Sequence, residues 1–457
     1  MRLLLVGAFP YPQHHGSQIY FQEQAIALRA RGAEISLLTY GAGKTPRAEN
    51  TPHPPNGSGP EADDARWIGA RAGEYWRAID GFDLLTTPKW MAPSSIRSGP
   101  SPGKPLADFG LVMTLRNAVA SMSRHAAFDA ILTHNAEATG ATLAALRMLR
   151  VPKPPVVYCV HTLLGKELSA YLRGPKTNGF LDRLGLTRAT GRPTRSLDRF
   201  GREIDQWLAR RSDGWISLTR SSNRVMRQFS KRPGTMIPPA LPDPLAGETA
   251  LDPVRTARQH GLEPGRFFLY SGNLDAYQEL DILAAAVRER RGGSRGMGGG
   301  MPVVLASHSP RSVAGWAEAM PGVDFRLVES AAEMQALLAA ARASLLMRRA
   351  EGGFPIKLVN SLAVGTPAIA FHEGEWGLEH ERNSLICSPD QPVESMAAAI
   401  DRLEHDDVLA ARLAAGARAL YLENHQPEPA AKQVLDLVHE IRHFHAGRGV
   451  DSGVDSG

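Results

Sequence analysis

Short apolar runs alternate with longer segments of helical periodicity along most of this chain. The first run, residues 3–7, ends in glycine and is followed by helical spacing at 18–31 and by a second apolar run at 35–40. Uninterrupted apolar runs of this length are typical of strands buried on both faces, so the order predicts a parallel strand–helix–strand unit. Further strands are predicted at 129–134, 156–161, 214–219, 267–272, 302–307, 323–328, 344–348, 367–371 and 384–388, and further helices at 108–126, 136–149, 279–292, 331–342, 356–364 and along 393–445.

A proline-rich segment at 238–244 separates two blocks of this alternation and is typical of a linker between domains. The alternation on both sides of it predicts an α/β protein with two Rossmann-like domains, residues 1–243 and 244–415. A helix at 416–445 is expected to pack back on the first domain. The end of the chain, residues 446–457, is expected to be disordered.

Residues 41–105 interrupt the alternation of the first domain. Their first part is rich in proline, glycine, asparagine and charge, and three tryptophans, Trp67, Trp76 and Trp90, follow in an irregular stretch. This composition predicts an insertion rather than a regular part of the sheet.

The composition is that of a globular protein. Hydrophobic residues make up 43% and charged residues 22% of the 457 residues, which excludes the intrinsically disordered class and suits two domains. The apolar run at the N-terminus has about seven residues, too few for a membrane span or a signal peptide, which favours a cytoplasmic protein. Cys159 and Cys387 lie in strand-like runs and are expected to be buried thiols, with one long-range disulfide as the alternative.

Positive charge is concentrated in one part of the chain. The formal net charge is +5, yet residues 166–232 contain 16 Lys or Arg against 6 Asp or Glu. Such a block favours contact with an anionic membrane surface, peripherally at the inner face, or else forms a solvated arginine-rich helical surface. A nucleic-acid partner is not expected.

The loops after two predicted strands bear on nucleotide binding. The first, GAFPYPQHHGSQ, lacks the GxGxxG pattern, and the chain has no GxxxxGK[ST] loop, which excludes the usual NAD, FAD and P-loop sites. Gly16 and Ser17 begin a helix there, as a phosphate site or as a plain capped turn. The second loop is stronger: Gly353 follows a strand and opens a helix with Pro355 in its first turn and Lys357 close by, which predicts an anion site for a diphosphate.

Several of these segments together resemble the retaining GT-B glycosyltransferases of family 4. The matching segments are LLLVGAFPYPQHHGSQIYFQEQAIALRARGAEISLLTY, DAILTHN, VVYCVHTL, FLYSGNLDAYQELDILAAA and EGGFPIKLVNSLAVGTPAIA. The resemblance implies a GT-B fold, with two Rossmann-like domains that face a central cleft. It also implies transfer of a sugar, with retention, from a nucleotide-diphosphate sugar to a lipid-linked or saccharide acceptor in cell-surface polysaccharide or glycolipid synthesis.

The sequence departs from the family pattern at positions that bind the donor. The family's arginine and lysine for the diphosphate are replaced by Asn273 and Gln278, and the second of its two signature glutamates by Asn360. The first glutamate is displaced by one residue, to Glu351. We expect Arg348, Arg349 or Lys357 to supply the missing positive charge.

The resemblance also assigns roles. His161 is expected to contact the transferred sugar near its reacting carbon, and Glu351 to bind sugar hydroxyls; a strand-end histidine and a solvated loop acid are the alternatives. No metal or cofactor is expected, because no DxD motif occurs. The acceptor side is assigned Ser17 and His134, and the donor side Gly16, Gly272, Asn273, Gln278, Gly353, Phe354, Pro355, Lys357, Leu358 and Asn360.

Two other functions stay open at this stage. The replaced residues would suit a non-catalytic GT-B-like subunit that only binds nucleotide sugars. A sugar-nucleotide epimerase on the same architecture is the other alternative. The sequence leaves the donor base, the donor sugar, the acceptor and the oligomeric state undetermined.

Overall fold

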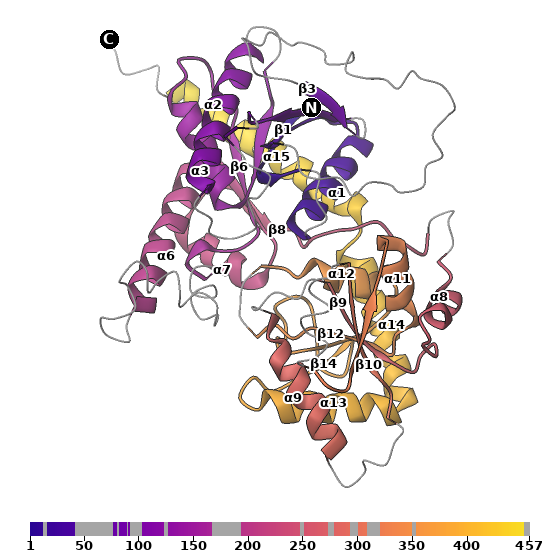
Figure 1. Ribbon diagram of the computed structural model, residues 1–457. Helices are drawn as coiled ribbons and strands as arrows, with labels where there is room; N and C mark the ends of the chain where they lie inside the picture. Colours follow the sequence, from indigo (N-terminus) through magenta and orange to yellow (C-terminus); the bar gives the residue numbers. More distant parts are fainter. Residues whose placement is uncertain are drawn as a thin grey trace, which may run out of the picture. The chain divides into compact units, whose positions relative to one another are not determined.

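The chain folds into two compact units (Figure 1). The computed structural model describes residues 1–11, 16–41, 76–79, 82–88, 90–91, 103–122, 127–166, 193–246, 251–272, 278–292, 300–308, 320–349 and 353–451. Unit 1 comprises Met1–Gly165, Arg199–Ile237 and Glu428–Gly457, and unit 2 comprises Lys166–Asp198 and Pro238–Pro427. Besides residues 166–198, the chain leaves unit 1 after residue 237, directly before the predicted proline-rich linker at 238–244, and returns to it at residue 428.

Unit 1 is built on an eight-stranded sheet of order β3-β4-β2-β1-β5-β6-β7-β8. All neighbouring strands are parallel except β3 and β4. The strands are β1 (Arg2–Pro10), β2 (Glu34–Tyr40), β3 (Trp76–Ile79), β4 (Phe82–Thr86), β5 (Ala130–His134), β6 (Val156–Val160), β7 (Gly214–Ser217) and β8 (Gly234–Met236). The helices with them are α1 (Gly16–Ala30), α2 (Lys104–Met122), α3 (Asn135–Arg147), α6 (Pro193–Arg211), α7 (Arg220–Phe229) and α15 (Pro427–Asp451).

Alternate residues of strand β1 face two different helical layers. Leu3 and Leu5 belong to the core that α1 and α15 cover, whereas Leu4 and Val6 belong to the core under α2 and α3. All four side chains are completely buried. A strand covered on both faces needs apolar residues at every position, which is why this run is continuous rather than alternating.

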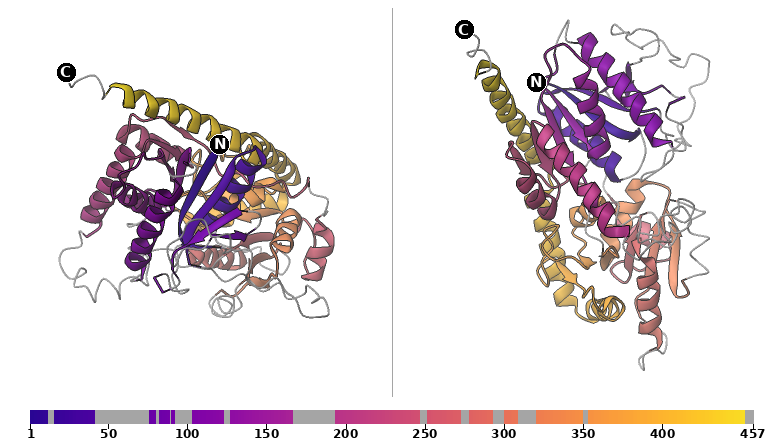
Figure 2. Two further views of the ribbon diagram at one scale, coloured as in Figure 1. Left: turned by 90° about the horizontal axis from the view of Figure 1, so that it is seen from above. Right: turned by 90° about the vertical axis from the view of Figure 1, so that its left-hand side faces the viewer.

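The C-terminal helix α15 belongs to the first of these layers. It contributes Val434, Val438 and Ile441 to the core of unit 1, and it lies along the sheet in yellow in Figure 2. The preceding helix α14 (Asp407–Asn424) packs in unit 2, so the predicted helical tail is divided near Pro427. Proline stabilises a helix start at this place because its missing N–H would have no partner there.

Two strands of the sheet, β3 and β4, lie within the predicted insertion at 41–105, in the stretch to which the sequence assigned no elements. Strand β4 pairs in parallel with β2, and its Phe82, Leu84 and Leu85 are buried. The run FDLLT is short and contains Asp83, so its apolar pattern gives too weak a signal for a strand. Residues 42–75 lie outside the described part of the chain.

Unit 2 is built on a six-stranded parallel sheet of order β11-β10-β9-β12-β13-β14. Its strands are β9 (Phe268–Ser271), β10 (Val303–Ser307), β11 (Val323–Leu327), β12 (Ala343–Leu345), β13 (Ala368–Ala370) and β14 (Ser384–Ile386). Its helices are α8 (Pro253–Gln259), α9 (Leu280–Gly292), α11 (Ala331–Ala340), α12 (Ile356–Ala363), α13 (Pro392–His405) and α14. Phe268 and Tyr270 of β9 face the core under α9 and α13, whereas Leu269 faces α11. The two predicted Rossmann-like domains are confirmed.

The structure can be compared with two sequence-based expectations, one about the cysteines and one about membrane-spanning helices. Cys159 lies buried in unit 1 and Cys387 buried in unit 2, and both are free thiols. Within the described residues, helices long and apolar enough to cross a membrane are absent.

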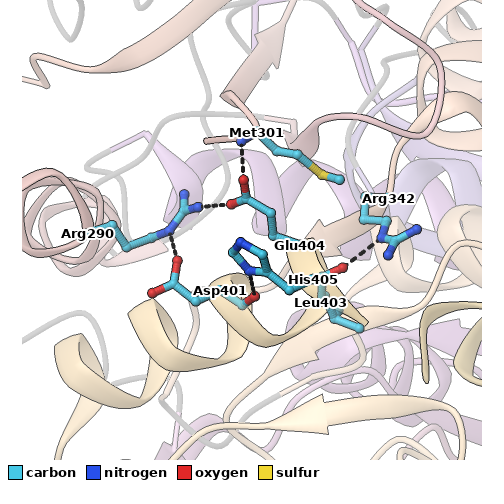
Figure 3. A network of polar contacts seen from close by, with 7 residues as sticks. All are labelled: Arg290, Met301, Arg342, Asp401, Leu403, Glu404 and His405. Atoms are coloured by element: carbon cyan, nitrogen blue, oxygen red, sulfur yellow. Dashed lines mark hydrogen bonds and ion pairs between the residues drawn. The ribbon is translucent and has the colours of Figure 1, made fainter. Parts of the chain in front are cut away.

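A half-buried polar network fixes the helical layer of unit 2 (Figure 3). Arg290 at the end of α9 donates to Asp401 of α13 at 2.6 Å and also pairs with Glu404. The other oxygen of Glu404 accepts from the backbone N–H of Met301 at 2.8 Å, just before β10. Because the side chains of Arg290 and Glu404 are only 11% and 8% exposed, each charge depends on the other for compensation.

Removal of Glu404 tests this network. Glu404→Ala should lower the free energy of unfolding by about 3 kcal/mol, because one nitrogen of the buried Arg290 guanidinium and the Met301 backbone N–H lose their acceptor, while the bond from Arg290 to Asp401 remains. Asp324→Ala is the matched control, since its 3.7 Å ion pair with Arg326 lies on edge strand β11 and is partly exposed, and it should cost at most about 1 kcal/mol. Urea unfolding followed by circular dichroism measures both; equal losses would contradict the assigned role.

Candidate functional site

Two histidines meet at the carboxyl ends of neighbouring strands in unit 1. His134 ends β5, and His161 directly follows β6, which pairs in parallel with β5. His134 Nδ1 and His161 Nε2 are 2.9 Å apart, within hydrogen-bond distance. His134 is completely buried, and His161 is partly exposed. The sequence placed both residues at adjacent strand ends, but the bond between them was not predicted.

Aromatic side chains of helix α1 enclose this pair. The ring of Tyr20 lies 5.3 Å from that of His161, and the ring of Phe21 lies 4.8 Å from that of His134, both edge to face. Gln24 donates to the Tyr20 hydroxyl at 2.8 Å, which holds the phenol in place. Sequence analysis missed Tyr20 and Phe21; their place in the first two turns after the glycine-led start of α1 was the available signal.

Burial keeps both histidines neutral. It lowers the pKa of His161 to about 4, and it holds the pKa of His134 well below its usual value, with the charge of His161 as a second cause. At neutral pH the pair therefore offers hydrogen-bond donors and acceptors to a ligand, not positive charge.

A carboxylate of helix α6 fixes the chain segment that follows His161. The two oxygens of Asp205 accept from the backbone N–H groups of Leu164 and Gly165, at 2.9 and 3.0 Å. Gly201 of the same helix lies so close that a Cβ there would meet the Cα of Gly165 at 2.6 Å. Burial raises the pKa of Asp205 to about 6, against the opposing effect of its two backbone donors. Helix α6 also contains Asp198 and Glu203, so no sequence signal singled out Asp205 for this contact.

The predicted start of helix α1 is present in the structure. Gly16 and Ser17 are its first two residues, and both are partly exposed. The N–H groups of a first helical turn lack carbonyl partners within the helix, so they can bind a polar or anionic group.

In unit 2, the glycine-led helix start lies where the sequence predicted it. Gly353 has φ of +44°, which favours glycine, and Pro355 is the N-cap of α12. Among the described residues, side chains do not cap this helix start. The first turn of α12 therefore presents the positive end of the helix dipole.

Lys357, in the first turn of α12, lies against the loop after strand β9. Its Nζ donates to Gln278 Oε1 at 3.2 Å and lies 4.1 Å from the centre of the Tyr270 ring. A Cβ at Gly272, whose φ is +118°, would lie 3.6 Å from the same nitrogen. The structure thus brings together three predicted donor-side residues, Gly272, Gln278 and Lys357; sequence analysis missed Tyr270.

The Lys357 amine is an unusual cation. Burial, together with the nearby positive charge of Arg348, lowers its pKa to about 7. Among the described residues it forms no ion pair with a carboxylate. An anionic ligand would stabilise the protonated form of such a buried amine.

One of the three arginine and lysine candidates for the missing charge is already paired. Glu279 accepts from the Arg349 guanidinium at 2.8 Å and from the Arg349 backbone N–H at 2.8 Å. This pair links the loop before α9 to the segment after β12, and Glu279 adopts a positive φ of 51° there. Arg349 therefore serves to join two loops, and Lys357 is the candidate that the geometry favours.

The remaining donor-side residues divide into three groups. Phe354 is nearly buried and packs on the rings of Trp376 and His425, at 6.4 and 5.3 Å. Leu358 is completely buried and its N–H bonds to the carbonyl of Pro355, so it supports the helix rather than reaching a ligand. Asn360 is partly exposed on α12. Asn273 and Glu351 lie outside the described residues.

Helix α6, within the predicted basic block, has an exposed surface of aromatic and basic side chains. Phe200 and Trp207 are 57% and 41% exposed and lie two helical turns apart on one face. Four exposed arginines of the helix accompany them: Arg199, Arg202, Arg210 and Arg211. Most of the block before α6, residues 167–192, lies outside the described part of the chain.

Comparisons with known proteins agree with this architecture. The model of a glycosyl transferase 4-like domain matches residues 15–240, and that of glycosyl transferases group 1 matches residues 265–406. A comparison with curated proteins finds no match.

Solved structures share the fold at low sequence identity. Sucrose-phosphate synthase from Thermosynechococcus elongatus is 17% identical, with a TM-score of 0.69 over 98% of this chain and 100% of that chain. Anabaena HepE in complex with UDP-glucose is 14% identical, with a TM-score of 0.63 over 96% and 100%. The trehalose 6-phosphate synthase from Burkholderia multivorans is 11% identical, with a TM-score of 0.64 over 97% and 99%.

The two family matches together cover most of the chain, one on each side of the linker, and the two sheets are those of the GT-B fold. The chain therefore belongs to the group 1 glycosyltransferases, enzymes that use nucleotide-sugar donors.

Proposed function

We propose that this protein is a retaining glycosyltransferase that moves a sugar from a nucleotide-diphosphate sugar to a lipid-linked or saccharide acceptor. In this proposal the protein acts in the synthesis of a cell-surface polysaccharide or glycolipid. The observation that carries the proposal is the half-buried Lys357 amine, which lies beside the glycine-led start of α12 without a described carboxylate partner. The solved HepE complex with UDP-glucose supports a nucleotide-sugar ligand for this fold.

The diphosphate is assigned to the start of α12. The helix dipole and the Lys357 charge would stabilise the negative charge that develops on the leaving diphosphate, which is the main electrostatic demand of the reaction. Gln278 holds the Lys357 amine at 3.2 Å, and Gly272 leaves room beside it. In this proposal Lys357, on α12, supplies the charge that the family's missing loop cations would provide, and no metal is required.

The sugar is assigned to His161 and Glu351. A neutral His161 would donate to or accept from a sugar oxygen near the reacting carbon, and Glu351 would bind sugar hydroxyls. In a front-face displacement the leaving phosphate takes the proton of the acceptor hydroxyl, so the protein needs to orient the substrates rather than to supply a strong base. Retention at the anomeric carbon follows from that route.

The acceptor is assigned to unit 1, near an anionic membrane surface. The exposed Phe200 and Trp207 can enter the interface of a bilayer, while the arginines around them pair with anionic headgroups. Asp205, on the buried side of the same helix, holds the segment after His161. The proposed membrane contact and the proposed sugar site would therefore be joined by one rigid helix.

Replacement of the family's cations favours one alternative, a subunit that binds nucleotide sugars without turnover. Acceptor-stimulated release of nucleoside diphosphate from UDP- or GDP-sugars distinguishes the two functions. We expect release that persists in EDTA and a product with the donor's anomeric configuration by NMR. Tight nucleotide binding without release would favour the binding subunit instead.

Glu351→Ala should lower kcat/KM by about 100-fold or more, because it removes sugar contacts made in the transition state, while the thermal unfolding midpoint stays unchanged. Asp324→Ala, a carboxylate removed from edge strand β11, serves as the control and should keep full activity. Full activity of the Glu351 variant would show that another acid binds the sugar.

Lys357 should impose a pH dependence on nucleotide binding. The free amine has a pKa of about 7, and a bound diphosphate raises that value, so binding takes up a proton above pH 7. The affinity for UDP or GDP should fall between pH 7.5 and 9, by at most about tenfold per pH unit. Calorimetric titrations in buffers of different protonation enthalpy measure both the affinity and the proton uptake.

Two variants distinguish the titration of Lys357 from the titration of other groups in the protein or the nucleotide. Lys357→Arg keeps its charge over this range, so its binding should be independent of pH, whereas Lys357→Met should bind weakly at every pH. Equal pH slopes in the unmodified protein and in Lys357→Met would place the diphosphate elsewhere.

The membrane assignment is tested with anionic and neutral liposomes. The double variant Phe200→Ser, Trp207→Ser should partition about tenfold less well to anionic liposomes in a sedimentation assay, and binding of the unmodified protein should weaken with salt. Val408→Ser, at an 80% exposed position of α14, is the control and should bind normally. Binding that is absent or insensitive to salt would contradict a peripheral association.

A further inference from the structure

The hydrogen bond between His134 and His161 determines which nitrogen of each ring carries the proton. Neutral imidazole has one N–H and one lone pair, so the bond between His134 Nδ1 and His161 Nε2 has two possible directions. The two directions present different groups to a substrate, and the surroundings of the rings distinguish between them.

The outer nitrogen of His134 decides the direction. His134 is completely buried, and its Nε2 has no hydrogen-bond partner among the described residues. If His161 donated, His134 would carry its proton on Nε2, and a buried N–H would be left without an acceptor. If His134 donates from Nδ1, only a lone pair is left unpaired there. Buried N–H groups without partners are the rarer case, because an unpaired donor in the interior is costly.

We infer that His134 is a positioning residue, whose Nδ1–H donates to Nε2 of His161 and so presents the Nδ1–H of His161 to the substrate. This inference rests on the proposed role of His161 at the transferred sugar. This role differs from the acceptor contact that the sequence predicted for His134, because His134 is completely buried and its ring is enclosed by Phe21 and Tyr20 at 4.8 and 5.9 Å.

The consequence concerns the proton of the reaction. With its Nε2 lone pair occupied by His134, His161 cannot take a proton from the acceptor hydroxyl through that nitrogen, and its Nδ1 already carries one. His161 therefore acts as a hydrogen-bond donor to a substrate oxygen rather than as a general base. The acceptor's proton must leave by another group, and the departing phosphate oxygen meets that need.

The resting protein gives a direct measurement. The full chain, labelled with ¹⁵N-histidine, is studied by long-range ¹H–¹⁵N correlation NMR, which distinguishes Nδ1–H from Nε2–H rings. The His161 signals are assigned by their absence from His161→Gln. His425 provides an internal reference, because its Nδ1 lies 2.7 Å from the carbonyl of Pro239 and must donate. We expect both His134 and His161 to show the Nδ1–H pattern of His425.

Two variants then test whether His134 sets the tautomer of His161. His134→Leu removes the donor but fills the site with an apolar side chain, and Nε2–H should become the major form of His161. His134→Asn offers an amide N–H close to the place of Nδ1, and it should restore the Nδ1–H form. In transfer assays, kcat should fall about tenfold in His134→Leu, the value of one hydrogen bond, with KM for the nucleotide sugar unchanged, and should recover in His134→Asn.

The outcomes separate this inference from the proposed function. Nε2–H on His161 in the unmodified protein would overturn the inference, as would an unchanged Nδ1–H form together with unchanged kcat in His134→Leu. A chain that transfers no sugar would overturn the proposed function, yet the tautomer measured in the resting protein would still decide the direction of the bond.

Discussion

A parallel sheet covered by helices on both faces leaves the carboxyl ends of its strands as the natural place for chemistry. In unit 1 the strands are buried by α1 and α15 on one face and by α2 and α3 on the other, so continuous apolar runs are required along them. Polar residues such as His134 and His161 therefore appear where these strands end. The same constraint in unit 2 places Gly272 after β9 and Gly353 ahead of α12. The histidine pair of unit 1 and the glycine-led helix start of unit 2 each follow from it.

Within unit 2, the distribution of positive charge depends on which cations the fold has already paired. Arg290 is paired in the network that joins α9 to α13, and Arg349 is paired with Glu279. Lys357 is different, because its described partners are an amide oxygen and an aromatic ring. A cation in these surroundings has a lowered pKa, and a bound anion would stabilise its charged form. The replacement of the family's loop cations by Asn273 and Gln278 is therefore compatible with diphosphate binding.

Within unit 1, burial lowers the pKa of two histidines in the same direction. It removes charge from His134 and His161 and turns them into a neutral hydrogen-bonded pair. A neutral pair is suited to orienting a sugar, whereas our proposal assigns the negative charge of the diphosphate to unit 2. This division agrees with a reaction in which the leaving group carries the charge and also takes the acceptor's proton.

The sequence by itself determined the elements that rest on local pattern: the strands with continuous apolar runs, the glycine-led helix starts, and the strand ends that carry His134 and His161. It failed where the local signal is short, as at β3 and β4 within 41–105, and along 393–445, where one helical pattern was in fact three helices, α13, α14 and α15. Only the tertiary structure decided which side chains pair: His134 with His161, Glu279 with Arg349, Asp205 with the loop at 164–165, and Lys357 with Gln278. These partners are from 27 to 79 residues apart in the chain. Local propensity is a property of neighbouring residues, whereas the pairing of charges and protons depends on distances of about 3 Å that exist only after the sheets have brought distant segments together.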